Sequence, residues 1–127
     1  MQKLTKAEEQ MMQLLWKLEK AFLKEIIDAY PEPKPKKSTI STVLRILEEK
    51  GFIRHESFGK VYQYIPVVTK EHYAKFYFGS FLTGYFDGSF QKLLSFFYKE
   101  GDLSMETLDA LMEMSEENPT EEETHEN

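Results

Sequence analysis

Residues Lys36 to Tyr64 decide the fold, and they read K-K-S-T-I-S-T-V-L-R-I-L-E-E-K-G-F-I-R-H-E-S-F-G-K-V-Y-Q-Y. Apolar side chains recur here at steps of three and four residues, which predicts one buried face of a helix: Ile40, Val43, Leu44 and Leu47. The opposite face carries short hydroxyls and one cation, namely Ser38, Ser41, Thr42 and Arg45. A face of this kind can approach a DNA groove closely.

The end of this helix and the segment after it extend the pattern. Lys50 puts a cation in the last turn, and Gly51 can adopt the left-handed conformation of a C-terminal cap without strain. Two strand-forming runs follow, at residues 52–56 and 61–65, and a glycine-containing turn with a lysine lies between them. Helix, cap and basic-tipped hairpin are the closing elements of a winged helix-turn-helix.

Two more helices are predicted upstream. Thr5 and Glu8 form a capping box that opens the first helix, which we expect to run to about Glu19. The second helix fits residues 22–30, and the prolines of residues 31–35 exclude helix after it. This connector either spans the surface or presses nearby cations toward a phosphate strand; these cations are Lys34, Lys36 and Lys37.

The composition changes at residue 69, because residues 69–98 hold 11 of the chain's 18 aromatic residues. The spacing predicts a helix after Thr69, a second from Ser89 to Lys99 and a third after Ser104, with a break near residues 84–88 where glycines occur. Helices this rich in apolar side chains are not expected to stay exposed on a soluble monomer. We expect a second copy to cover this apolar surface; packing onto the N-terminal helices as one monomeric core is the alternative. The expected dimer contacts are Tyr73, Phe76, Tyr77, Phe81, Tyr85, Phe90, Leu93, Leu94, Phe97, Leu108, Leu111 and Met112.

The fold class is therefore mostly α with a small β hairpin (α+β). Residues 1–68 form a winged helix-turn-helix DNA-binding domain, residues 69–115 a helical dimerisation region and residues 116–127 an acidic tail that we expect to be disordered. The net charge of −6 is unevenly distributed. Residues 1–68 carry 12 Lys/Arg and 9 Asp/Glu, whereas residues 69–127 carry 4 and 13. The local excess of cations in the first part is compatible with phosphate contacts.

The chain lacks the residues that several classes of function require. The chain has no cysteine, and His55, His72 and His125 have no second metal ligand at helical or hairpin spacing. Paired carboxylates such as Glu48-Glu49 and Glu116-Glu117 are adjacent residues of a solvated helix end or tail, not two groups aimed at one cleft. Phosphate loops and nucleophile motifs are missing. We therefore expect no enzyme, no catalytic residue, no metal and no cofactor. No apolar run is long enough to span a bilayer and no signal peptide is visible, so we expect no membrane insertion and a cytoplasmic location.

The chain resembles the penicillinase-repressor family, which groups beta-lactamase and methicillin-resistance repressors with copper-responsive relatives. The matching residues are Leu4 to Glu8, Leu15-Trp16, Ser38 to Ile53 and Gly59 to Tyr64, and the likeness continues more weakly through Phe90 to Phe97 and Leu103-Ser104. The resemblance implies a homodimeric repressor whose winged helices bind the major groove of a palindromic operator in double-stranded DNA. Copper-responsive relatives use a cysteine motif, which this chain does not contain.

The resemblance also implies release by a membrane-bound metalloprotease sensor, through cleavage in the dimerisation region. The best-known relatives present Asn followed by Phe at the cleaved bond, whereas this chain has Phe96-Phe97, or Ser95-Phe96 one residue earlier. It also has Ser41 and Ile46 where those relatives carry basic residues, so their operator sequence does not transfer.

We expect the groove-facing residues to be Ser38, Thr39, Ser41, Thr42 and Arg45, and further DNA contacts to come from Lys36, Lys37, Arg54, Lys60 and Tyr62. One alternative is a winged helix that acts as a protein-interaction module. The other is a regulator that binds a small ligand among the aromatic side chains of residues 73–98.

Overall fold

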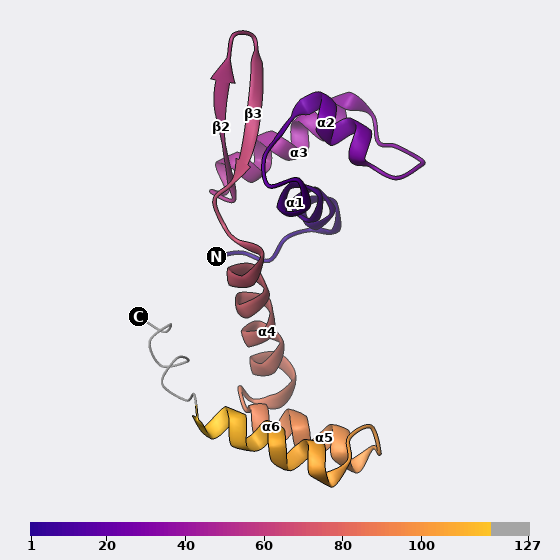
Figure 1. Cartoon of the computed structure of the whole chain (residues 1–127), viewed down its shortest axis with the longest axis vertical. Helices are drawn as coiled ribbons and strands as arrows, with labels where there is room; N and C mark the ends of the chain where they lie inside the picture. Colours follow the sequence, from indigo (N-terminus) through magenta and orange to yellow (C-terminus); the bar gives the residue numbers. More distant parts are fainter. Residues whose placement is uncertain (118–127) are drawn as a thin grey trace. The chain divides into compact units, whose positions relative to one another are not determined.

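The computed structural model describes residues 1–117 (Figure 1). Side chains are described as far as Glu113. The chain is mostly helical with one small antiparallel sheet, so the predicted α+β class is confirmed. The chain divides into two compact units, residues 1–76 and the residues from Tyr77 onward. In chain order the elements are α1 (Lys6–Leu18), β1 (Ala21–Phe22), α2 (Leu23–Ala29), α3 (Lys37–Glu49), β2 (Ile53–Phe58), β3 (Val61–Pro66), α4 (Lys70–Phe86), α5 (Phe90–Lys99) and α6 (Met105–Glu117).

Local signals set the helix ends in the first unit. The predicted capping box opens α1: the Thr5 hydroxyl accepts a hydrogen bond from the Glu8 N–H at 3.2 Å, and the Glu8 carboxylate accepts one from the Thr5 N–H at 2.9 Å. Gly51 follows α3 with φ of 83°, as the sequence predicted, and its substitution would strain the backbone.

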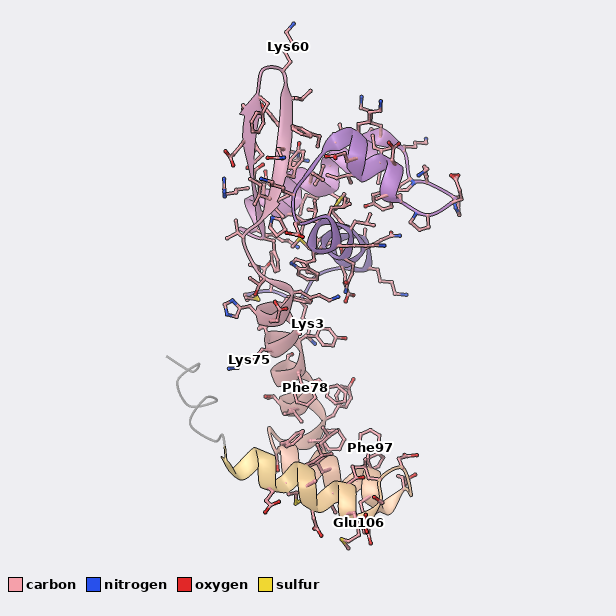
Figure 2. All side chains as sticks on the ribbon, viewed as in Figure 1. Lys3, Lys60, Lys75, Phe78, Phe97 and Glu106 are labelled. Carbon is pink, nitrogen blue, oxygen red and sulfur yellow. The ribbon has the colours of Figure 1, made fainter. Side chains whose placement is uncertain are left out.

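The sheet has three strands in the order β1-β3-β2, all antiparallel. The predicted hairpin is confirmed, and because Phe58 pairs with Val61, its turn is Gly59-Lys60. Figure 2 shows Lys60 at the tip. Strand β1 was not predicted, since two residues are too few to show an alternating pattern. Its pairing with β3 takes Phe22 out of the helix predicted over residues 22–30, so α2 spans only Leu23–Ala29.

The core of the first unit lies between α1, α2, α3 and the sheet. The stripe predicted on α3 supplies Ile40, Leu44 and Leu47, each at most 1% exposed, while Val43 is partly buried at its edge. Burial of a side chain of this size contributes about 1.5–3 kcal/mol. The other buried members are Met11, Met12, Leu15, Ala21, Ile26, Tyr30, Phe52, Ile53 and Tyr73.

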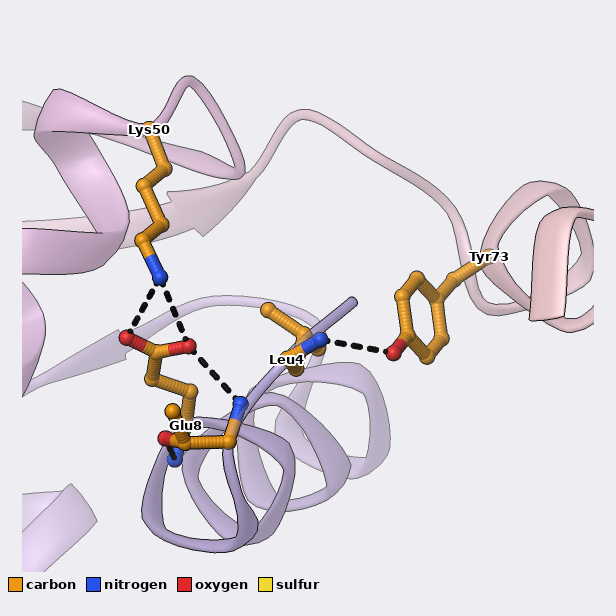
Figure 3. A network of polar contacts seen from close by, with 5 residues as sticks. Leu4, Glu8, Lys50 and Tyr73 are labelled. Atoms are coloured by element: carbon orange, nitrogen blue, oxygen red, sulfur yellow. Dashed lines mark hydrogen bonds and ion pairs between the residues drawn. The ribbon is translucent and has the colours of Figure 1, made fainter. Parts of the chain in front are cut away.

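The first turns of α4 belong to this core. Tyr73 is 4% exposed, its ring lies 5.9 Å from that of Phe52, and its hydroxyl accepts a hydrogen bond from the Leu4 N–H at 2.9 Å (Figure 3). Phe76 packs against the same cluster. Trp16 donates to the Val68 carbonyl at 2.9 Å, which holds the connector between β3 and α4. Tyr73 and Phe76 were expected at the dimer contact, but the structure places Tyr73 in the core of its own chain and packs the partly buried Phe76 against that core.

The second unit holds the rest of α4 together with α5 and α6. Gly79 and Gly84 lie inside α4, and the predicted break comes at Asp87 and Gly88, both with positive φ. Serines cap the next two helices: Ser104 accepts from the Thr107 N–H, as predicted, and Ser89, expected as the first residue of its helix, is instead the N-cap of α5 and accepts from the Lys92 N–H. Among the described residues, the buried side chains of this unit are Leu82, Leu93, Leu94 and Leu108.

Helix α6 ends at Glu117, two residues inside the stretch that we expected to form the acidic tail. The remainder of that stretch lies outside the described residues. Within residues 1–117, no helix has the length and apolar character needed to cross a membrane. Among the side chains described, as far as Glu113, no three or more His, Asp or Glu residues are grouped so that they could hold a metal ion.

Candidate nucleic-acid interface

The outer face of α3 is exposed along its length. Ser38, Thr39, Ser41, Thr42 and Arg45 all lie on the surface. The Thr42 hydroxyl donates to the Ser38 carbonyl at 2.9 Å, so its oxygen remains an acceptor while its proton is engaged. Arg45 pairs with Glu49 at 3.3 Å, and both side chains are more than 60% exposed. An exposed pair one helical turn apart is worth only a few tenths of a kcal/mol, so Arg45 can exchange this partner for another acceptor.

The N-terminus of α3 concentrates positive charge. Lys36 is the N-cap and Lys37 the first helical residue; both are exposed, and Lys36 has no side-chain acceptor for the first backbone N–H groups. Two cations at the positive end of a helix dipole are unfavourable in the isolated protein. An anion bound at this end would accept hydrogen bonds from the free backbone N–H groups and would offset the unfavourable interaction between the two lysines and the helix dipole.

The hairpin of β2 and β3, residues 53–66, is called the wing below, and it adds exposed cations and aromatic side chains. Lys60 occupies the turn, and Arg54 on β2 pairs with Glu56 at 3.5 Å with both side chains about half exposed. Tyr62, 46% exposed, stacks on His55 with ring centroids 4.1 Å apart and an interplanar angle of 21°. The predicted DNA contacts of the wing therefore all lie on the surface.

His55 has a partner that the sequence did not predict. Its Nδ1 lies 2.6 Å from Oε2 of Glu48 in the last turn of α3, and both side chains are about one-third exposed. This contact joins α3 to β2 of the hairpin. Burial, with smaller contributions from the charges of Glu48 and Tyr62, raises the pKa of the neighbouring Tyr64.

A second ion pair orients α3 against α1. The Lys50 ammonium donates to both carboxylate oxygens of Glu8, at 3.0 and 2.9 Å, and Glu8 is 5% exposed (Figure 3). Burial alone would raise the pKa of Glu8, but hydrogen bonds from Lys50 and Thr5 and the charge of Lys50 outweigh it and hold that pKa below its ordinary value. Lys50 was expected to act on the helix dipole; its main partner is this carboxylate.

Lys34 also has a structural role. Its ammonium donates to the carbonyls of Ile27, Asp28 and Tyr30 at 2.7–3.1 Å, and so caps the C-terminus of α2. Of the three lysines near the proline-rich connector, Lys36 and Lys37 remain candidates for phosphate contact. Proximity in sequence could not separate these roles.

The second unit exposes large apolar side chains. Tyr77, Phe78, Tyr85, Phe96, Phe97 and Met105 are between 37% and 77% exposed. Figure 2 labels two of them, Phe78 and Phe97. Phe81, Phe90, Leu111 and Met112 are partly buried, whereas Leu93, Leu94 and Leu108 are buried within the unit. Ser95, Phe96 and Phe97, where we placed the cleavage, lie within α5. A shallow groove opens beside them, lined by Phe86, Gln91, Lys92, Ser95, Phe96 and Lys99.

Helices α1 to α3 followed by a hairpin with a cationic tip, with the outer face of α3 exposed beside it, define the class of winged-helix DNA-binding proteins. The penicillinase repressor family model matches residues 4–117. A penicillinase repressor of Bacillus licheniformis is 29% identical over 114 residues, which cover 87% of this chain and 88% of that protein. The chain therefore belongs to the penicillinase repressor family, a family of DNA-binding transcriptional repressors, as its resemblance predicted.

Proposed function

We propose that this protein represses transcription as a homodimer that binds a palindromic operator. The observation that carries the proposal is the exposed, hydroxyl-rich face of α3 between two cationic elements, the N-terminus of α3 and the wing. In this arrangement Ser38, Thr39, Ser41, Thr42 and Arg45 read base edges in the major groove. Phosphates are held by Lys36, Lys37, Arg54, Lys60 and the Tyr62 hydroxyl.

The homodimer forms through the second unit. Its exposed aromatic side chains, among them Tyr85 and Phe96, are a surface that a soluble chain rarely leaves open to water. A second copy removes this area from water and holds two winged helices at a fixed spacing. Linking two recognition modules raises the effective concentration of the second one, so affinity depends steeply on the dimer.

Loss of that dimer would release the repressor from its operator. A protease that cuts near Ser95 to Phe97 would remove α6 and part of α5 from each chain while leaving residues 1–76 intact. Because these residues lie in a helix, the segment has to unwind before it fits a protease site. The proposed partner is a membrane-bound metalloprotease sensor, in keeping with the family resemblance.

The test is binding of the purified protein to its own upstream DNA and to random DNA over a range of salt concentrations, with sedimentation in parallel. We expect a preference of at least about a hundredfold for a palindromic site and a dimer at micromolar concentration. Weak binding, equal on both DNAs, would overturn the repressor assignment and favour a protein-interaction module. A monomer that still binds specifically would overturn the dimer alone.

A further inference from the structure

Neither Glu48 nor His55 is among the DNA contacts proposed above. The Glu48–His55 pair lies at the junction of α3 and the wing, with Arg45 one turn before Glu48 and Tyr62 stacked on His55. Both neighbours belong to the proposed DNA contacts. An ionised Glu48 at this position adds a negative charge to a surface that has to receive phosphates, whereas a protonated His55 cancels it.

We propose that Glu48 and His55 are positioning residues that hold the wing against the recognition helix, and that binding of operator DNA takes up a proton at this pair. The inference rests on the proposed function. Phosphates near the junction favour the charged imidazolium, which donates to Glu48 at 2.6 Å and lies flat on the Tyr62 ring. Since linkage is reciprocal, protonation also strengthens DNA binding.

Three elements, α3, β3 and β2, contribute the other charged and titratable groups near the Glu48–His55 pair. Helix α3 contributes Arg45 and Glu49, which pair with each other, and β3 contributes Tyr62 and Tyr64, whose ring lies 6.1 Å from that of His55. On β2 itself, Arg54 and Glu56 flank His55 in sequence, so they lie on the opposite face of the strand, where they pair with each other. Glu48 is therefore the carboxylate in contact with the imidazole.

The experiment measures operator affinity of the full chain at pH 8 and pH 6 at constant ionic strength. It adds calorimetry in two buffers of different ionisation enthalpy, which counts the protons taken up. We expect tighter binding at pH 6, by at most about tenfold per pH unit for each His55, and a net proton uptake. His55→Gln should bind at pH 6 no better than at pH 8. Glu48→Gln should bind more tightly than the wild type at pH 8 and depend less on pH.

Two variants serve as controls. His72→Gln changes an exposed histidine at the start of α4 and should keep the wild-type pH dependence. Glu56→Gln removes a carboxylate from the other face of the wing and should strengthen binding equally at both pH values. Specific binding without pH dependence, or the same dependence in His55→Gln as in the wild type, would overturn the inference alone. Equal binding to operator and random DNA at both pH values would overturn the proposed function as well.

Discussion

The two units of this protein bury their apolar side chains to different extents. The first unit has a cluster of twelve buried residues drawn from α1, α2, α3, the sheet and the start of α4. In the described part of the second unit only Leu82, Leu93, Leu94 and Leu108 are buried, while Tyr85 is 77% exposed. A recognition surface needs a rigid support, which a closed core supplies. An association surface needs apolar area that is still open.

Leu47→Ala should cause the largest loss of stability. Leu47 is fully buried on the inner face of α3, and truncating it leaves a cavity that costs about 2–5 kcal/mol. Urea unfolding should show this loss at every protein concentration, because the cavity lies in a core that one chain completes. Val67→Ala, at a site 53% exposed, is the control and should change little. If the loss of stability disappeared at high protein concentration, the core of the first unit would depend on a second copy, and the prediction would be wrong.

Glu8→Gln should destabilise the first unit by about 1–3 kcal/mol at pH 7, because it weakens charge-assisted hydrogen bonds in a buried setting. The pKa of Glu8 is lowered by folding, so its contribution is present above the ordinary carboxyl pKa and is lost as the pH falls through the lowered value. Urea midpoints at pH 7 and pH 3 should therefore differ less in Glu8→Gln than in the wild type. Glu9→Gln, an exposed neighbour, is the control.

Arg45→Ala should reduce discrimination between operator and random DNA by about 1–3 kcal/mol if Arg45 reads a base. Competition binding measures this ratio. Glu49→Ala removes the ion-pair partner but keeps the cation, and should preserve the discrimination. Equal weakening by Arg45→Ala on every sequence would move this residue to the phosphate contacts.

Phe96→Ser tests the second unit. Phe96 is 47% exposed, and if it lies at the centre of the proposed interface its truncation costs about 1–2 kcal/mol, roughly a five- to thirtyfold rise in the dimer Kd. Sedimentation equilibrium measures that constant. Val67→Ser, which removes exposed apolar area from the first unit, should leave it unchanged. An unaltered dimer in Phe96→Ser would place the contact elsewhere.

Lys60→Ala should have the smallest effect. If Lys60 contacts one phosphate, its loss lowers the slope of log affinity against log salt by about one unit for each wing, with little change in sequence preference. The matched control is Lys99→Ala, which removes an exposed cation from the second unit and should keep the wild-type slope. An unchanged slope in Lys60→Ala would remove the wing tip from the DNA contacts.

Signals carried by a few neighbouring residues were predictable. The Thr5–Glu8 capping box, the apolar stripe of α3 and the left-handed Gly51 depend on backbone geometry and helical periodicity. The exposed face of α3 follows from the same periodicity, because residues opposite a buried stripe have to face outward. The family resemblance used these same residues and was confirmed.

Pairings between distant segments were not predictable. Glu8 and Lys50 are 42 residues apart, and nothing near either residue indicates the other. Strand β1 exists because Ala21 and Phe22 meet β3, and a strand of two residues has no pattern of its own. His55 has no partner at helical spacing, yet the bend from α3 into β2 brings it to Glu48.

The amino-acid pattern thus sufficed for the class of fold, for the buried and exposed faces of α3 and for the change of composition at residue 69. The contacts between segments determined which charges are engaged and which remain open: Lys34 and Lys50 are used within the chain, whereas Lys36, Lys37 and Lys60 are exposed. They likewise put Tyr73 into the core of the first unit and left Tyr85 on the surface. The physical reason is that periodicity reports which side of an element is apolar, while burial and ion pairing depend on which other element comes to lie against that side.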